Sequence, residues 1–249
     1  MSKIWGSGRG SSIPPQNIYE ESATPLIPVG TRLQLGDRVF RYSSAGAAIN
    51  QGWLLASAPL GGAVTTAQKD LVVAAAVAGQ DYFTVTTHTT AQPANRFADG
   101  WATVVSDTCT HGAGVAYRIK SHPAQAAAGP LKITLYDDLH KAVTANCKVS
   151  LTANLWARIV HTPATTAAGM PVGVSLIDVT SNYYFWCQTW GPAALLTGST
   201  CTVDSSLIRG LEEGRSDIQT AGGLTAQIAM SIEAGTNGDL PLSYLMIAP

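Results

Sequence analysis

The pattern of apolar and polar positions predicts short β-strands along most of the chain. Residues 32–35 and 38–42 alternate apolar with polar side chains and flank the turn signal Gly36-Asp37, which predicts a hairpin. The run 71–76 is short and rich in Val, which favours a strand over a short Ala-based helix, and it forms a second hairpin with 82–87. Further strands are expected over 101–106, 114–120, 131–136, 148–151, 156–161, 172–179, 183–189, 193–196, 225–233 and 242–247.

Many short strands separated by Gly, Pro and Asp are typical of an all-β protein built from antiparallel sandwich or barrel modules. We expect an extended N-terminal arm over residues 1–29, a β-rich module over 30–165 and a second one over 166–249. In the first segment, alternating glycines and four prolines exclude a regular helix or a central strand. No repeat with a fixed period is evident.

One segment combines many aromatic residues with almost no charge. Between Arg158 and Asp204 the only charged residue is Asp178, and residues 183–190 hold five aromatics in eight positions. Such a segment is buried in a core or covered by another chain. Strand alternation places Tyr183, Phe185, Cys187 and Thr189 on one face and Tyr184, Trp186, Gln188 and Trp190 on the other, so both faces are predicted to be covered. Gly191-Pro192 is expected to end this strand.

The composition favours a protein that is packed in an assembly. Charged residues make up 12% of the 249 residues, against about 25% in an ordinary soluble domain, and the net charge is -1. With no basic block, nucleic acid is not the expected partner. No apolar run reaches the roughly 20 residues that span a bilayer, so no membrane partner is expected either. The N-terminus has no apolar signal core, which argues against secretion by that route.

The four cysteines, Cys109, Cys147, Cys187 and Cys201, all lie in strand-like sequence and form no C-x-x-C pair. We expect four reduced, unpaired core residues, with a disulfide between two of them as the less favoured alternative.

The titratable residues form no convincing catalytic or metal site. Cys109-x-His111 offers two metal ligands without a second pair, and Asp137-Asp138-x-His140 fits a turn after a strand better than a cation site. The charged segment 209–217 is expected to be a solvated loop, or a polar contact with a neighbouring subunit. The sequence therefore predicts no enzyme activity, no cofactor and no metal.

Several segments together resemble structural proteins of tailed bacteriophage heads, which are described as decoration, cement or head-fibre proteins. The resemblance covers residues 30–200 and is carried by Gly36-Asp37-Arg38-Val39-Phe40-Arg41-Tyr42, Phe97-Ala98-Asp99-Gly100-Trp101, Ala116-Tyr117-Arg118-Ile119-Lys120-Ser121-His122-Pro123, Leu131-Lys132-Ile133-Thr134-Leu135-Tyr136-Asp137 and Tyr184-Phe185-Trp186-Cys187-Gln188-Thr189-Trp190-Gly191-Pro192. It implies β-rich modules, a place on the capsid surface of the virion after synthesis in the host cytoplasm, and no catalytic residues.

We therefore expect a non-enzymatic virion structural protein that binds the assembled capsid lattice and stabilises it. Its expected partners are the major capsid protein and itself, as a homo-oligomer; the trimer is suggested by analogy with lattice three-fold positions. The alternative is a receptor- or glycan-binding module of a head fibre or tail, which exposed Trp and Tyr would favour. Candidate capsid or subunit contacts are Trp5, Arg9, Pro14, Pro15, Tyr184, Trp186 and Trp190.

Overall fold

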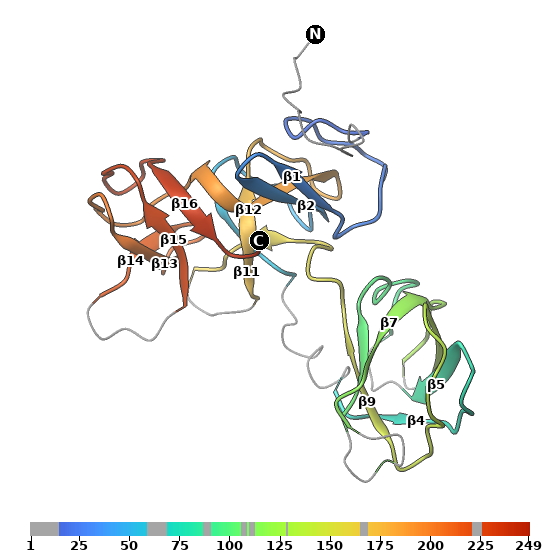
Figure 1. Cartoon of the computed structure of the whole chain (residues 1–249). Helices are drawn as coiled ribbons and strands as arrows, with labels where there is room; N and C mark the ends of the chain where they lie inside the picture. Colours follow the sequence, from blue (N-terminus) through green and yellow to red (C-terminus); the bar gives the residue numbers. More distant parts are fainter. Residues whose placement is uncertain are drawn as a thin grey trace. The chain divides into compact units, whose positions relative to one another are not determined.

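The computed structural model describes residues 15–58, 69–86, 91–105, 109, 113–127, 129–164, 169–220 and 226–249. Within these ranges the chain forms strands and turns without a helix, which confirms the predicted all-β class (Figure 1). The strands are β1 (Arg32–Leu35), β2 (Arg38–Ser44), β3 (Leu54–Ala56), β4 (Leu71–Val73), β5 (Tyr82–Thr86), β6 (Trp101–Val104), β7 (Ala116–Ser121), β8 (Pro130–Leu135), β9 (Lys148–Thr152), β10 (Val160–His161), β11 (Pro171–Ser175), β12 (Tyr184–Ala194), β13 (Ser206–Arg209), β14 (Ser216–Ile218), β15 (Gln227–Ser231) and β16 (Leu242–Met246).

The strands belong to two compact units, and the second is inserted into the first. Unit 1 comprises residues 1–59 and 155–249, and unit 2 comprises residues 60–154. This division differs from the predicted boundary between 165 and 166. The reason is long-range pairing: β3 pairs with β10 and β11, and β2 pairs with β12, so strands before the insertion share a sheet with strands after it.

Unit 2 is a closed barrel of six strands in the order β4-β5-β8-β7-β6-β9 (Figure 1). Its strands alternate as expected for a surface that is half buried: Leu131, Ile133 and Leu135 of β8 point into the core, whereas Lys132 between them is exposed. A single core cluster that includes Phe83 fills the barrel. Closure pairs each barrel strand on both sides, so the barrel leaves no open sheet edge.

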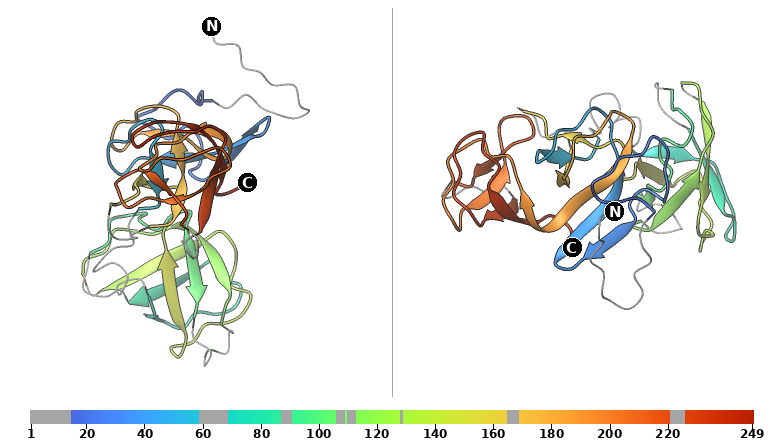
Figure 2. Two further views of the ribbon diagram at one scale, coloured as in Figure 1. Left: turned by 90° about the vertical axis from the view of Figure 1, so that its left-hand side faces the viewer. Right: turned by 90° about the horizontal axis from the view of Figure 1, so that it is seen from above.

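Unit 1 contains a ten-stranded sheet in which β12, with eleven residues, pairs with β2, β11 and β16 (Figure 2). The prediction that Gly191-Pro192 ends this strand is wrong. Gly191 has φ +87, and a Cβ there would lie 2.5 Å from the Asp37 carbonyl oxygen, so only glycine lets the strand continue at this close approach. The buried Gln188 amide also donates to the carbonyls of Trp190 and Pro192, at 3.1 and 2.8 Å.

Three sets of strands repeat one nested arrangement. In each set the first strand pairs with the last, the second pairs with the next to last, and an isolated bridge joins the loop after the first strand to the loop before the last. The sets are motif A (β2, β3, β11, β12; bridge Ile49–Val179), motif B (β4, β5, β8, β9; bridge Ala76–Val143) and motif C (β12, β13, β15, β16; bridge Cys201–Gly235). Motifs A and C share β12, and motif B belongs to the barrel.

The same four-residue turn follows each of the six bridge residues. The N–H of its fourth residue donates to the carbonyl of its first, at 2.9 to 3.4 Å. In five turns the third residue has a positive φ, which Gly, Asn and Asp adopt most readily. These five are Gly52, Gly79, Asn182, Asp204 and Gly238. The spacing between the turns is uneven, which explains why the sequence shows no fixed period.

The described part of the predicted arm packs against unit 1. Gln16 and Ile18 are buried, and the Gln16 carbonyl accepts a 3.0 Å hydrogen bond from Nε1 of Trp186. The Gln16 side chain accepts a 2.7 Å bond from the Tyr42 hydroxyl, and Ser22 forms an isolated bridge with Tyr184. Residues 15–29 are therefore part of the folded unit. The extended arm stays a prediction for residues 1–14, which lie outside the described residues.

Candidate functional site

Of the seven predicted contact residues, the structure describes four. Trp5, Arg9 and Pro14 lie outside the described residues, and Pro15 is exposed. The other three, Tyr184, Trp186 and Trp190, all belong to β12. Trp186 is buried, whereas Tyr184 and Trp190 are both half-buried.

Trp186 is a core residue. It is 1% exposed, packs edge-on against the Tyr42 ring at 5.2 Å between centroids, and donates its indole N–H to Gln16. Strand alternation was predicted correctly here, because Phe185 and Cys187 lie in one core cluster and Trp186 lies in another with Tyr184 packed against it. Trp186 is therefore neither a contact residue nor a sugar-stacking residue.

A β-bulge in β12 turns the Trp190 side chain to the opposite face of the sheet from Trp186. Gln188 pairs with Phe40 and Trp190 pairs with Val39, so Thr189 is the extra residue in β12. Val39 and Phe40 are adjacent on β2 and point to opposite faces of the sheet. An extra residue shifts the alternation by one, so the prediction that Trp186 and Trp190 share a face is wrong.

Trp190 belongs to a continuous apolar surface on the outside of motif C. The residues directly opposite one another are Trp190 with Met246, Pro192 with Tyr244, and Tyr244 with Met230. The Trp190 and Tyr244 rings meet edge-on, 6.0 Å apart. We call this surface the motif C face; it consists of Trp190, Pro192, Ala194, Met230, Ile232, Leu242, Tyr244 and Met246.

None of these eight side chains is charged, although several are open to solvent within the described residues; the Glu233 carboxylate borders them and accepts the Leu242 backbone N–H at 3.1 Å. Met230, Ile232 and Leu242 are 36%, 41% and 36% exposed. The next residues inward, such as Ser243 and Leu245, are fully buried, so the strands alternate between a covered inner face and an uncovered outer one. Large exposed apolar patches are typical of interaction sites, so this face is the candidate site.

The other two motifs show that the fold does not itself require this surface. On the corresponding strands of motif B, the outward residues include Lys132, Lys148 and Ser150. On motif A, the outer face is aromatic, with Tyr42 and Trp186, and it is covered by residues 15–29 of the same chain. The outer face of motif B is therefore mostly polar, and the outer face of motif A is apolar but covered.

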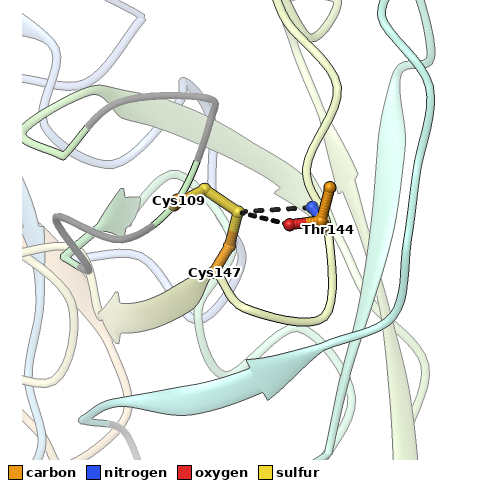
Figure 3. Close-up of a disulfide and its surroundings, with 3 residues drawn as sticks. All are labelled: Cys109, Thr144 and Cys147. Atoms are coloured by element: carbon orange, nitrogen blue, oxygen red, sulfur yellow. Dashed lines mark hydrogen bonds between the residues drawn. A yellow bond between two sulfur atoms is a disulfide. The ribbon is translucent and has the colours of Figure 1, made fainter.

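The disulfide corrects the prediction for two of the cysteines. Cys109 and Cys147 are bonded in unit 2, with Cα atoms 4.5 Å apart, although 38 residues separate them in sequence (Figure 3). Thr144 donates its backbone N–H to the Cys147 sulfur at 3.3 Å (Figure 3). The closed barrel brings the pair together, which strand-like context alone does not indicate. Cys187 and Cys201 are free and buried as predicted, and burial raises the pKa of the Cys187 thiol.

The described residues contain no cluster of three or more His, Cys, Asp or Glu that could hold a metal ion. Cys109 is not available as a ligand because it is in the disulfide, and His111 lies outside the described residues. Nδ1 of His140 lies 2.7 Å from the Tyr117 hydroxyl, so it takes part in the packing of the barrel.

Two histidines hold loops in place: His122, which is buried, and His161, which is half-buried. Nε2 of His122 accepts a 3.0 Å bond from the Phe97 backbone, and Nε2 of His161 accepts a 2.9 Å bond from the Asn50 backbone. Nδ1 of His122 lies close to the Pro123 carbonyl oxygen, and Nδ1 of His161 lies close to a carboxylate oxygen of Glu213. Burial lowers the pKa of both imidazoles. They are structural groups in the neutral form, because an imidazolium has no acceptor for the backbone N–H.

Comparisons with protein-family models, curated proteins and solved structures find no significant match. Among the described residues, no helix has the length and hydropathy needed to cross a lipid bilayer.

Proposed function

We propose that this chain is a non-enzymatic structural subunit of a larger protein assembly, bound there through the motif C face. The observation that carries the proposal is this surface of eight outward apolar side chains, which lacks charge and which the described residues leave open. The low charge of the whole chain supports the same conclusion. With 12% charged residues, electrostatic repulsion between protein molecules is weak and does not oppose close packing.

The assembly that we propose is the head of a tailed bacteriophage, with the chain on the capsid surface. The sequence resemblance over residues 30–200 supports this choice and names the major capsid protein as partner. Contact with a second copy of the chain, in a trimer, is part of the same proposal. Each interface of standard size buries on the order of 1,600 Å². Because the subunit binds the assembled lattice, it stabilises that state by mass action.

A charge placed on the motif C face tests the proposal. Ile232→Asp puts a carboxylate into the interface while leaving the core of unit 1 unchanged, because Ile232 is 41% exposed. We expect the variant to fold but to bind particles at least about tenfold more weakly, since an unpaired buried charge is costly. Binding is measured by cosedimentation of the purified chain with particles that lack it.

Val203→Asp is the matched control. Val203 is 62% exposed, lies in the same unit, and is not part of the motif C face. It receives the same charge at a position where no partner is expected. If Ile232→Asp and Val203→Asp both bind like the unmodified chain, the motif C face is not the interface and the proposal fails.

A further inference from the structure

A second surface, on the outside of the unit 2 barrel, combines exposed aromatic rings with hydrogen-bonding groups. Trp101 of β6 lies opposite Arg118 of β7 and opposite Thr152 of β9. Tyr136, just after β8, donates its backbone N–H to the Arg118 carbonyl at 3.0 Å. These residues and Asp99, which precedes Trp101 in the chain, form one row across four neighbouring strands, which we call the aromatic row.

The polar groups of the aromatic row are connected to one another. The Tyr136 hydroxyl donates to Oδ1 of Asp99 at 2.9 Å, and the Arg118 guanidinium lies 3.5 Å from the same oxygen. The guanidinium also lies over the Tyr136 ring, 5.4 Å from its centroid. Within the described part of the chain, Oδ2 of Asp99 and the indole N–H of Trp101 have no hydrogen-bond partner. Both are free to bind a ligand.

The backbone holds this row in a fixed position. Asp99 has φ +57, and its N–H donates to the Ile119 carbonyl at 2.8 Å. A Cβ on Gly100 would lie 2.1 Å from the Thr152 carbonyl oxygen, so β6 and β9 meet there with no room for a side chain. Asp99 and Trp101 are thus presented from a rigid corner, which reduces the entropy lost when a ligand binds.

The two aromatic rings are exposed in a polar setting. Trp101 is 47% exposed and Tyr136 is 53% exposed, and they are two of the three exposed aromatic side chains in the described residues. The residues that contact or lie opposite these rings are polar or charged, namely Arg118 and Thr152. This differs from the motif C face, where apolar side chains adjoin one another. Trp, Tyr and Arg are also common in protein interfaces, so a protein contact is one of the outcomes that the test below distinguishes.

We propose that the aromatic row is a binding site for a neutral oligosaccharide. A pyranose ring has an apolar C–H face, which packs on an indole, and hydroxyls at its edge, which bond to carboxylates and guanidinium groups. Asp99 and Arg118 balance each other's charge, which suits an uncharged sugar. Nucleic acid is disfavoured, because the cation that would meet a phosphate is already paired with a carboxylate. The site is independent of the assembly proposed above.

The full chain is titrated with neutral tetrasaccharides of glucose, mannose and N-acetylglucosamine, and the indole N–H signal of Trp101 is followed by NMR. The signal is assigned by its loss in Trp101→Phe. We expect saturable shifts with at least one of the sugars. Trp101→Ala and Asp99→Asn should each weaken binding by at least about tenfold, as measured by saturation-transfer NMR. Val77→Ala, at a 66% exposed position of the same unit outside the row, should bind normally.

Three outcomes overturn the proposal. The first is that none of the sugars shifts the Trp101 signal. The second is sugar binding that survives Trp101→Ala unchanged. The third is a change in the sedimentation of the chain with Trp101→Ala, which would identify the row as a protein contact. Failure of the motif C face leaves these measurements unaffected, so the two proposals fail separately.

Discussion

Motifs B and C have the same nested pairing but opposite outer surfaces. In motif B the outward positions carry Lys132, Lys148 and Ser150, with the exposed Val72 beside Lys148, and in motif C they carry Trp190, Leu242 and Tyr244. The inner faces of both are apolar and buried. Because one motif folds with a polar outer face, the apolar outer face of the other is not needed for folding, and we attribute it to contact with another chain.

Motif A completes the comparison. Its outer face is also apolar, and residues 15–29 of the chain cover it, with Gln16 and Ile18 buried there. In this protein, an apolar outer face is therefore associated with a covering segment. For the motif C face, our proposal is that another protein chain provides the cover.

The largest effect is expected from a change inside unit 1. Trp186→Ala removes a fully buried indole and leaves the Gln16 carbonyl without its donor. Loss of such a residue costs about 3–5 kcal/mol of unfolding free energy. We expect calorimetry to show a large drop in the melting temperature of unit 1, with the unit 2 transition unchanged. Trp101→Ala, at an exposed tryptophan, is the control. Unchanged unfolding of Trp186→Ala would contradict the described core.

Removing the disulfide should affect unit 2 instead. Cys109→Ala combined with Cys147→Ala opens a loop of 38 residues and is expected to cost about 2–4 kcal/mol. Unit 2 should melt earlier and unit 1 should not. Mass spectrometry of the intact protein under non-reducing conditions should find one disulfide and two free thiols. Finding four free thiols would restore the prediction made from the sequence.

Gln16 tests whether residues 15–29 belong to the fold. Gln16→Ala leaves the buried Tyr42 hydroxyl without its acceptor, which costs about 1–3 kcal/mol, in unit 1 only. Burial already raises the pKa of Tyr42, so the hydroxyl stays protonated and needs that acceptor. Deletion of residues 1–14 is the matched comparison and should leave the unfolding of unit 1 unchanged in a urea titration. A larger loss of unfolding free energy from the deletion of residues 1–14 than from Gln16→Ala would contradict this assignment.

The smallest effect concerns pH. His122 in unit 2 and His161 in unit 1 have lowered pKa values in the folded state, so the unfolded chain binds protons first as the pH falls. Both units should therefore lose stability as the pH falls below about 6.5 and be insensitive above it. Urea titrations across this range measure the slope. The double variant His122→Gln, His161→Gln should show a smaller dependence of the unfolding free energy on pH. The same dependence in the double variant as in the unmodified chain would assign the effect to other groups.

The sequence predicted the positions of most strands, but it did not predict which strands pair with one another. Alternation in residues 183–187 assigned each side chain to its correct core cluster, and the hairpin turn at Gly36 was recognised. The strands β3, β13 and β14 were missed, although β4, which is no longer than β3 and β14, was predicted. Segment 209–217, expected to be a loop, contains an end of β13 and the start of β14.

The candidate site was only partly predictable. Trp190 was identified, but the bulge at Thr189 that turns it away from Trp186 depends on pairing with β2, which is distant in sequence. The remaining residues of the motif C face come from strands that meet only in the folded sheet. The repeated turns, such as Thr180 to Tyr183 and Thr202 to Ser205, do leave a trace, because Thr begins them and Asn or Asp occupies the third position. Their uneven spacing concealed it.

The most direct test of the central claim is cryo-electron microscopy of a phage particle that contains this chain. We predict density for the chain on the outer surface of the capsid, with Trp190, Ile232 and Leu242 buried against another protein chain and with Lys132 and Lys148 open to solvent. A particle map in which the motif C face is open to solvent while the polar face of motif B forms the contact would contradict the account.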